Sequence, residues 1–200
     1  MDATVSTVGH GSASGTPDTM RLRVAVGTTD RSVRAALAGV AAGVRRLGEV
    51  AREHTTEDRI TTRNLNVWPQ HEQDDTVHYR ASQSIDVHCG SFDAAGALVV
   101  QLAEALGDGL EIHGVQPLLG DTEALAQTAR ARAFEDARGK AEELAGLAGR
   151  TLADVVSVRE DAGGVGPMEA GAELVSARSM PFEPGSASVT ASLTVTWLMR

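Results

Sequence analysis

The sequence predicts an α+β fold in which strands and helices follow one another in the order ββαββαβαββ. Several short segments alternate apolar and polar residues, as strands with one buried face do, whereas three longer segments repeat apolar or small residues every three or four positions, as amphipathic helices do. Because the two kinds of element do not alternate strictly, we expect mainly antiparallel or mixed sheets with packed helices. Two hundred residues suffice for one large domain or two small ones, and we expect a single domain over residues 1–200.

Two strands and a helix are predicted at the start of the chain. The strands span residues 3–11 and 18–28, and the turn residues between them are rich in glycine and serine. In the second strand, apolar residues alternate with arginines and an alanine, which indicates one buried face. Asp30 is suited to cap the following helix, which we expect to run to about Glu53.

A hairpin and a second helix come next. The hairpin strands span residues 59–69 and 77–89 around a polar tip. In the second of these strands Ile85, Val87 and Cys89 share one face. Ser84, Asp86 and His88 share the other. Ser91 is suited to cap the second helix, and Gly107 to end it.

The second half of the chain contains the longest predicted helix. A strand at about 110–119 precedes this helix, which we expect from Asp121 to Ala148, with Gly149 after it. Its inner stripe is mostly alanine, which lets a helix approach a sheet closely. The predicted stripe consists of Ala126, Ala129, Ala133, Ala137, Ala141, Leu144 and Ala148.

Two strands and a long loop complete the prediction. A strand spans residues 152–160, and the Gly/Pro-rich segment 161–185 is predicted to be a loop that is functional, mobile or ordered only by a neighbouring molecule. The last strand has the clearest alternation and is expected within the sheet. Its inward residues are Val189, Ala191, Leu193, Val195 and Trp197.

Composition and charge exclude several classes of function. The formal charge of −9 argues against nucleic acid and anionic lipid as partners, because both require a basic surface. Cys89 is the only cysteine, so no intrachain disulfide can form. The N-terminus has no signal-peptide pattern, and no apolar run reaches the ~18 residues of a membrane span. We therefore expect a cytoplasmic protein without membrane insertion. The abundance of Ala, Gly and Arg suggests a GC-rich genome, and we expect a bacterial one.

Three groups of residues have the chemistry of a site, and for each we favour a structural role. His71, Glu72, Asp74, Asp75 and His78 crowd the hairpin tip. A hairpin could bring the two histidines across from each other as metal ligands, but a solvated acidic turn fits their spacing better. His88 and Cys89 are adjacent on a strand and should point to opposite faces, which leaves the cysteine as a small buried residue. The serines and glycines around His10 match neither a nucleophile elbow nor a dinucleotide loop. We expect these glycines to relieve crowding in an edge strand or a bulge, and we assign no catalytic, cofactor-binding or metal-binding residue.

The order of short signatures along the chain resembles the SIMPL domain, and the similarity covers nearly the whole sequence. The matching signatures are Val8-Gly9 with Gly11, Pro17-Asp18, Ile60-Thr61-Thr62, Trp68-Pro69, the strand 79–87, the helix 129–148 with Asp136, Lys140 and Leu144, and Pro184-Gly185. The resemblance implies an α+β domain that is often envelope-associated, that assembles into oligomers in some members, and that has been linked to stress tolerance and signalling. It implies no catalytic residues.

Two functions remain open from the sequence. The first is a non-enzymatic, self-assembling homo-oligomer, serving as a scaffold or a stress-related binding protein, in which the loop 161–185 contacts a neighbour. The apolar residues Trp68, Met168, Met180 and Phe182, in or near loops, fit two roles equally well, as anchors of such an interface or as cover for the ends of the domain's own core. The second is an enzyme or small-ligand-binding protein with a pocket near Arg80, Asp86 and His88.

Overall fold

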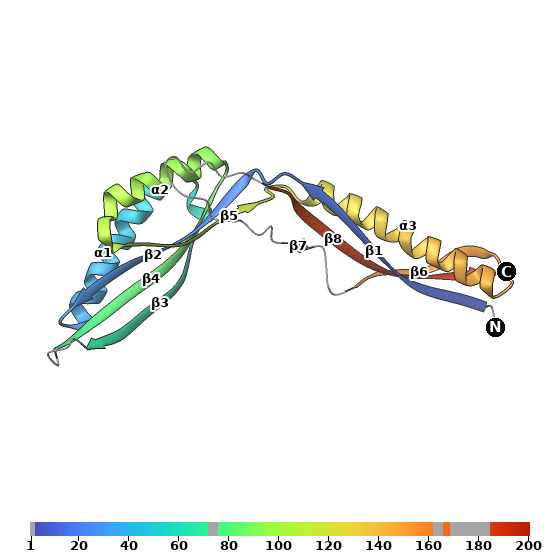
Figure 1. Ribbon diagram of the computed structural model, residues 1–200, viewed down its shortest axis with the longest axis horizontal. Coiled ribbons are helices and arrows are strands. Elements are labelled where there is room, and N and C mark those ends of the chain that lie inside the picture. The colour runs from blue at the N-terminus through green and yellow to red at the C-terminus, as the bar shows by residue number, and fades with distance from the viewer. Residues whose placement is uncertain (1–2, 72–75, 162–165, 169–184) are drawn as a thin grey trace. The chain divides into compact units, whose positions relative to one another are not determined.

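The computed structural model describes residues 3–71, 76–161, 166–168 and 185–200, and these form two compact units (Figure 1). Unit 1 consists of residues 3–17, 119–161, 166–168 and 185–200, and unit 2 of residues 18–71 and 76–118. The sequence prediction of an α+β fold with packed helices is confirmed, and both sheets are antiparallel.

Unit 2 is a four-stranded sheet with two helices on one face (Figure 1). The strands lie in the order β3-β4-β2-β5. Their bounds are Thr19–Asp30 for β2, Ile60–His71 for β3, Val77–Cys89 for β4 and Leu110–Leu118 for β5. The helices are α1, Val33–Ala51, and α2, Phe92–Leu106, and short 3-10 turns at Glu57–Arg59 and Gly107–Gly109 lead into β3 and β5. We call the sheet face opposite α1 and α2 the open face.

The helix caps of unit 2 agree with the sequence at α2 and differ at α1. The Ser91 hydroxyl accepts a hydrogen bond from the Ala94 amide, as predicted, and Gly107 ends the helix with a φ of 52°. At α1 the cap is Ser32, not Asp30, and its hydroxyl accepts from the Ala35 amide. The strand β2 runs through Asp30 itself, whose carboxylate instead accepts from the Ser32 amide.

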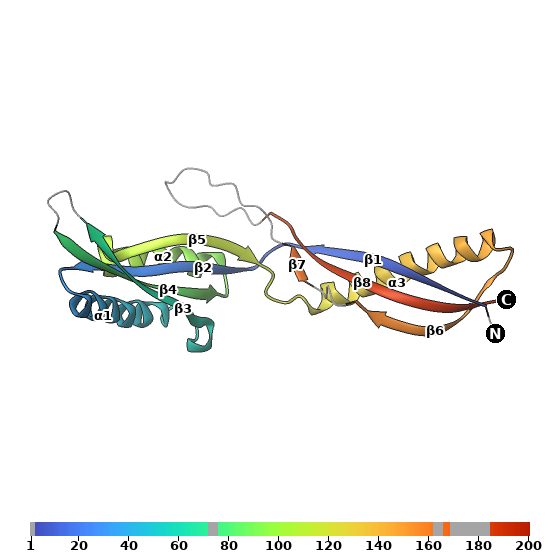
Figure 2. The same ribbon diagram turned by 90° about the horizontal axis from the view of Figure 1, so that it is seen from below.

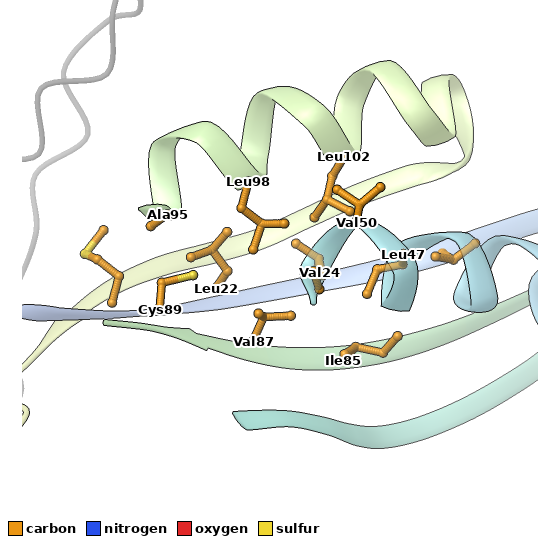
Figure 3. Packing of buried hydrophobic residues seen from close by; sticks show 13 residues of the cluster. Leu22, Val24, Leu47, Val50, Ile85, Val87, Cys89, Ala95, Leu98 and Leu102 are labelled. Atoms are coloured by element: carbon orange, nitrogen blue, oxygen red, sulfur yellow. The ribbon is translucent and has the colours of Figure 1, made fainter. Parts of the chain in front are cut away.

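The core of unit 2 lies between its sheet and its helices. Figure 3 shows the inward residues of β2 and β4, such as Leu22 and Val87, meeting Leu98 and Leu102 of α2. All four are fully buried. The alternation predicted for β4 is confirmed, with Cys89 in this core.

Unit 1 is a second antiparallel sheet covered by one long helix. The strands β1, Ala3–Gly15, β8, Ala187–Met199, and β6, Leu152–Glu160, lie in the order β1-β8-β6, with β6 along the edge (Figure 2). The predicted inward residues of β8, from Val189 to Trp197, are all buried. The segment predicted as a loop contains a short strand, β7, Gly166–Met168, which pairs with β8. Residues 162–165 and 169–184, including Met180 and Phe182, lie outside the described residues.

The helix of unit 1, α3, Glu123–Leu147, packs against β1 through its alanine stripe. The predicted stripe is correct as far as Ala141, but Ala145 continues it in place of Leu144 and Ala148. From Ala129 on, the buried alanines follow a four-residue spacing, and Leu144 lies about 100° around the helix from Ala145. Its side chain is therefore 47% exposed.

Two glycines of β1 allow this close packing. A Cβ added at Gly9 would lie 2.0 Å from the carbonyl oxygen of Ala133, and one at Gly11 would lie 2.1 Å from that of Ala129. Both contacts are with backbone, so no side-chain rotation could relieve them. The expectation that these glycines relieve crowding in an edge strand is confirmed, and the crowding comes from α3.

Candidate functional site

The hairpin tip does not bring its two histidines together. His71 is opposite Val77 and His78 is opposite Gln70 in the β3–β4 register, so the two imidazoles lie on opposite faces of the hairpin. The expectation that they could lie across from each other is wrong. Residues 72–75 lie outside the described residues, and among those described no three metal-ligating side chains cluster.

Cys89 and His88 point to opposite faces of β4, as predicted. The cysteine is fully buried among the core residues, and burial raises the pKa of its thiol. A buried thiol with a raised pKa is a poor nucleophile at neutral pH. His88 lies on the open face, so these two side chains form no thiolate–imidazole pair.

Side chains of α3 occupy the outer edge of β1. The Asp136 carboxylate accepts a hydrogen bond of 2.8 Å from the His10 amide and one of 2.7 Å from Lys140. Lys140, the only lysine of the chain, also donates to the carbonyl oxygen of Val8. Arg132 donates to the carbonyl oxygen of Ser12. We call this set the β1 edge cap, because it uses the backbone groups with which another strand would otherwise pair.

Two of the other edge strands, β3 and β6, are largely exposed. In β3, Leu65 and Val67 lie on the helix-facing side of the sheet and Trp68 on the open face, and all three are exposed, Leu65 to 50%. In β6, Val155 and Val158 lie on the α3 side, and Val156 is 54% exposed. Among the described residues, no side-chain hydrogen bond reaches the backbone of β3 or β6 in the way that the β1 edge cap reaches β1.

The strongest electrostatic feature is a buried carboxylate on the open face of unit 2. Asp86 is fully buried. Its Oδ2 accepts from the Nε and Nη2 of Arg63, at 2.9 and 2.7 Å, and its Oδ1 accepts from the Nε of Arg23 at 3.4 Å. Burial alone would raise the pKa of Asp86, but the hydrogen bond and charge of Arg63, together with the charge of Arg23, lower it overall.

The surroundings of Asp86 are positively charged. His88 lies two residues farther along the same face of β4, and its pKa is lowered first by burial and then by the charge of Arg21, with smaller effects from Arg59 and Arg63. The charge of Asp86 raises the pKa of His88, but the effects that lower this pKa are larger in total. The imidazole is therefore neutral at pH 7 and adds no charge of its own.

Arg80 does not join this group. It lies on the same face of β4 but six residues away, about 20 Å along the strand. Its guanidinium pairs with Glu111 of β5 and also contacts the hydroxyl of Thr29. Of the three residues expected to line a pocket, the structure therefore groups Asp86 with His88 only.

The arginines that contact Asp86 were not singled out from the sequence. Arg23 was visible on the polar side of its alternating strand, and Arg63 stands in a strand with no clear alternation. Two β-bulges flank their position. One places Arg63 as an extra residue in β3, and the other disrupts the pairing of β2 and β5 after Arg23. Local periodicity contains no signal for a bulge.

Comparison with known proteins places both units in one family. Among the described residues, no helix is both long and apolar enough to cross a bilayer. None of the curated proteins matches the sequence significantly. The model of the SIMPL family, described as a protein of unknown function (DUF541), matches residues 5–197. The chain, with its capped β1, its exposed β3 and β6 and its arginine-bound Asp86, thus belongs to the SIMPL family.

Proposed function

We propose that this protein is a non-enzymatic scaffold that assembles with further copies of itself through the strands β3 and β6. The observation that carries the proposal is the contrast among edges. The edge of β1 is hydrogen-bonded by α3, whereas the edge strands β3 and β6 expose apolar side chains. Natural sheets usually protect such edges, and exposed ones serve for association.

The exposed residues favour a second protein surface over solvent. Leu65 and Val67 lie on one side of β3, and Trp68 on the other, so a partner strand added to this edge would cover apolar groups on both faces. Tryptophan is enriched at the centres of interfaces. In β6, Val155, Val156 and Val158 are likewise exposed, the first and last of them on the α3 side. A stress-related role, expected from the family resemblance, stays a prediction.

The native mass tests the proposal. Light scattering on a sizing column should show wild-type protein as a discrete multiple of 20.8 kDa. Two variants remove one surface each, Leu65→Lys with Val67→Lys on β3 and Val155→Lys with Val158→Lys on β6, because lysines on an edge strand block pairing. Each should lower the mass. A control, Val100→Lys, places lysine at a valine of α2 that is 58% exposed, and should leave the mass unchanged.

Mixing the two variants identifies how the edges pair. If β3 of one copy pairs with β6 of another, each variant alone is a monomer and the mixture contains a dimer, because each retains one intact surface. If β3 pairs with β3 and β6 with β6, each variant alone is a dimer, and mixing the two variants produces no species of a different mass. A wild-type monomer, or an assembly that neither variant reduces, would show that these strands are not assembly surfaces.

A further inference from the structure

The open face of unit 2 holds two guanidinium groups side by side. Arg63 of β3 and Arg23 of β2 bind different oxygens of the same Asp86 carboxylate, which fixes their positions on either side of β4. Their side chains are 53% and 51% exposed, whereas Asp86 is buried. Both arginines therefore keep donors directed away from the carboxylate and accessible to a ligand.

Arg23, Arg63 and Asp86 together carry a net positive charge. The single negative charge of Asp86 is shared by the two guanidiniums that bind it. Like charges brought together repel one another, and this protein gathers them although its overall charge is −9. A bound anion would remove the repulsion.

We propose that Arg23 and Arg63 form a binding site for a dianionic phosphate group of a small soluble molecule, with Asp86 as the positioning residue. A phosphate monoester carries a charge of −1.5 to −2 at pH 7 and presents three oxygens, which allows it to bridge two guanidiniums.

The geometry and the overall charge favour a soluble phosphate over a lipid headgroup. A membrane surface that contains anionic lipids is negatively charged and repels a chain of charge −9. The two arginines also reach the same carboxylate, Arg23 from the position directly opposite Asp86 and Arg63 from the bulge two residues after the β3 residue that is opposite Asp86. This arrangement suits a single phosphate group.

Calorimetric titration with inorganic phosphate, at constant ionic strength in chloride, tests the site. Wild-type protein should bind one phosphate per chain. Arg23→Gln and Arg63→Gln should each weaken binding at least tenfold. The control Arg46→Gln removes an exposed arginine of α1 that pairs with Glu49, and should leave affinity unchanged.

A second variant separates binding from folding. Arg63→Gln alone leaves Asp86 with one fewer partner and could destabilise unit 2. The double variant Arg63→Gln with Asp86→Asn replaces the charge pair by two amides, which can hydrogen-bond each other. It should fold with a thermal midpoint near that of wild type and still fail to bind phosphate. Absence of saturable phosphate binding by wild type, equal weakening by Arg46→Gln, or binding to phosphatidylglycerol vesicles without binding to phosphate would each overturn the proposal.

Discussion

The closeness of α3 and β1 leads to a quantitative prediction for Gly9→Ala. The added Cβ would lie 2.0 Å from the carbonyl oxygen of Ala133, 2.5 Å from the amide nitrogen of Ala137 and 2.7 Å from the Cβ of Ala137. Ordinary contact for a Cβ begins at 3.4 Å. Helix and strand must therefore separate by more than 1 Å along this contact, since the opposing atoms are backbone.

The separation removes specific interactions. The Thr7 hydroxyl donates a 2.7 Å hydrogen bond to the carbonyl oxygen of Ala137, and the His10 amide donates to Asp136. Overpacking a close contact destabilises by about 1–3 kcal/mol. Loss of a hydrogen bond adds about 1 kcal/mol. We therefore expect Gly9→Ala to destabilise unit 1 by about 2–4 kcal/mol.

Urea unfolding followed by the fluorescence of Trp197 measures this effect. The chain has two tryptophans, and Trp197 is buried against Phe134 in unit 1, whereas Trp68 is in unit 2. A Trp68→Phe background leaves Trp197 as the reporter of unit 1. In that background Gly9→Ala should lower the free energy of unfolding by the amount given above.

Gly139→Ala is the matched control. This glycine lies in α3, and an added Cβ would meet nothing within 4 Å. Alanine is preferred over glycine in a helix by about 1 kcal/mol, so this variant should be as stable as wild type or more stable. If Gly9→Ala and Gly139→Ala had the same effect, close packing of β1 on α3 would be refuted as the reason for the glycine.

Three further predictions concern single groups. Lys140→Met should speed hydrogen exchange of the His10 amide, because Lys140 orients the Asp136 carboxylate that accepts a hydrogen bond from this amide. The control is Val100→Met. Exchange as slow as in this control would show that the β1 edge cap does not protect the strand. Folding lowers the pKa of Asp86, so the stability that this carboxylate contributes is present above its unfolded pKa of about 3.9 and is lost as the pH falls below about 4. The urea midpoints at pH 7 and pH 3 should therefore differ less in Asp86→Asn than in wild type. An equal difference in the two proteins would contradict this role. Cys89 should react with iodoacetamide only in denaturant, because it is fully buried and its thiol pKa is raised by burial; rapid labelling of the native protein, read by mass spectrometry, would contradict the buried position.

The sequence predictions were correct where the pattern depended on residues close together in the chain. The alternation in β4 and β8 and the cap at Ser91 depend on residues next to one another in the chain, and they were correct. At α1 two suitable capping residues, Asp30 and Ser32, stood close together, and the extent of β2 decided between them. At the end of α3 the four-residue spacing selected Ala145 over Leu144.

The sequence by itself determined the order of the elements, the face that each clear strand buries, the burial of Cys89 and the family to which the chain belongs. Only the tertiary structure decided which strands became edges and what meets there. Arg23 and Arg63 reach Asp86 across 63 and 23 residues of chain, and Asp136 reaches His10 across 126. These contacts depend on strand order, register and bulges. Register and strand order depend on pairing between segments that are distant in the sequence. The residues next to an arginine or a lysine in the sequence therefore do not predict which side chain it binds.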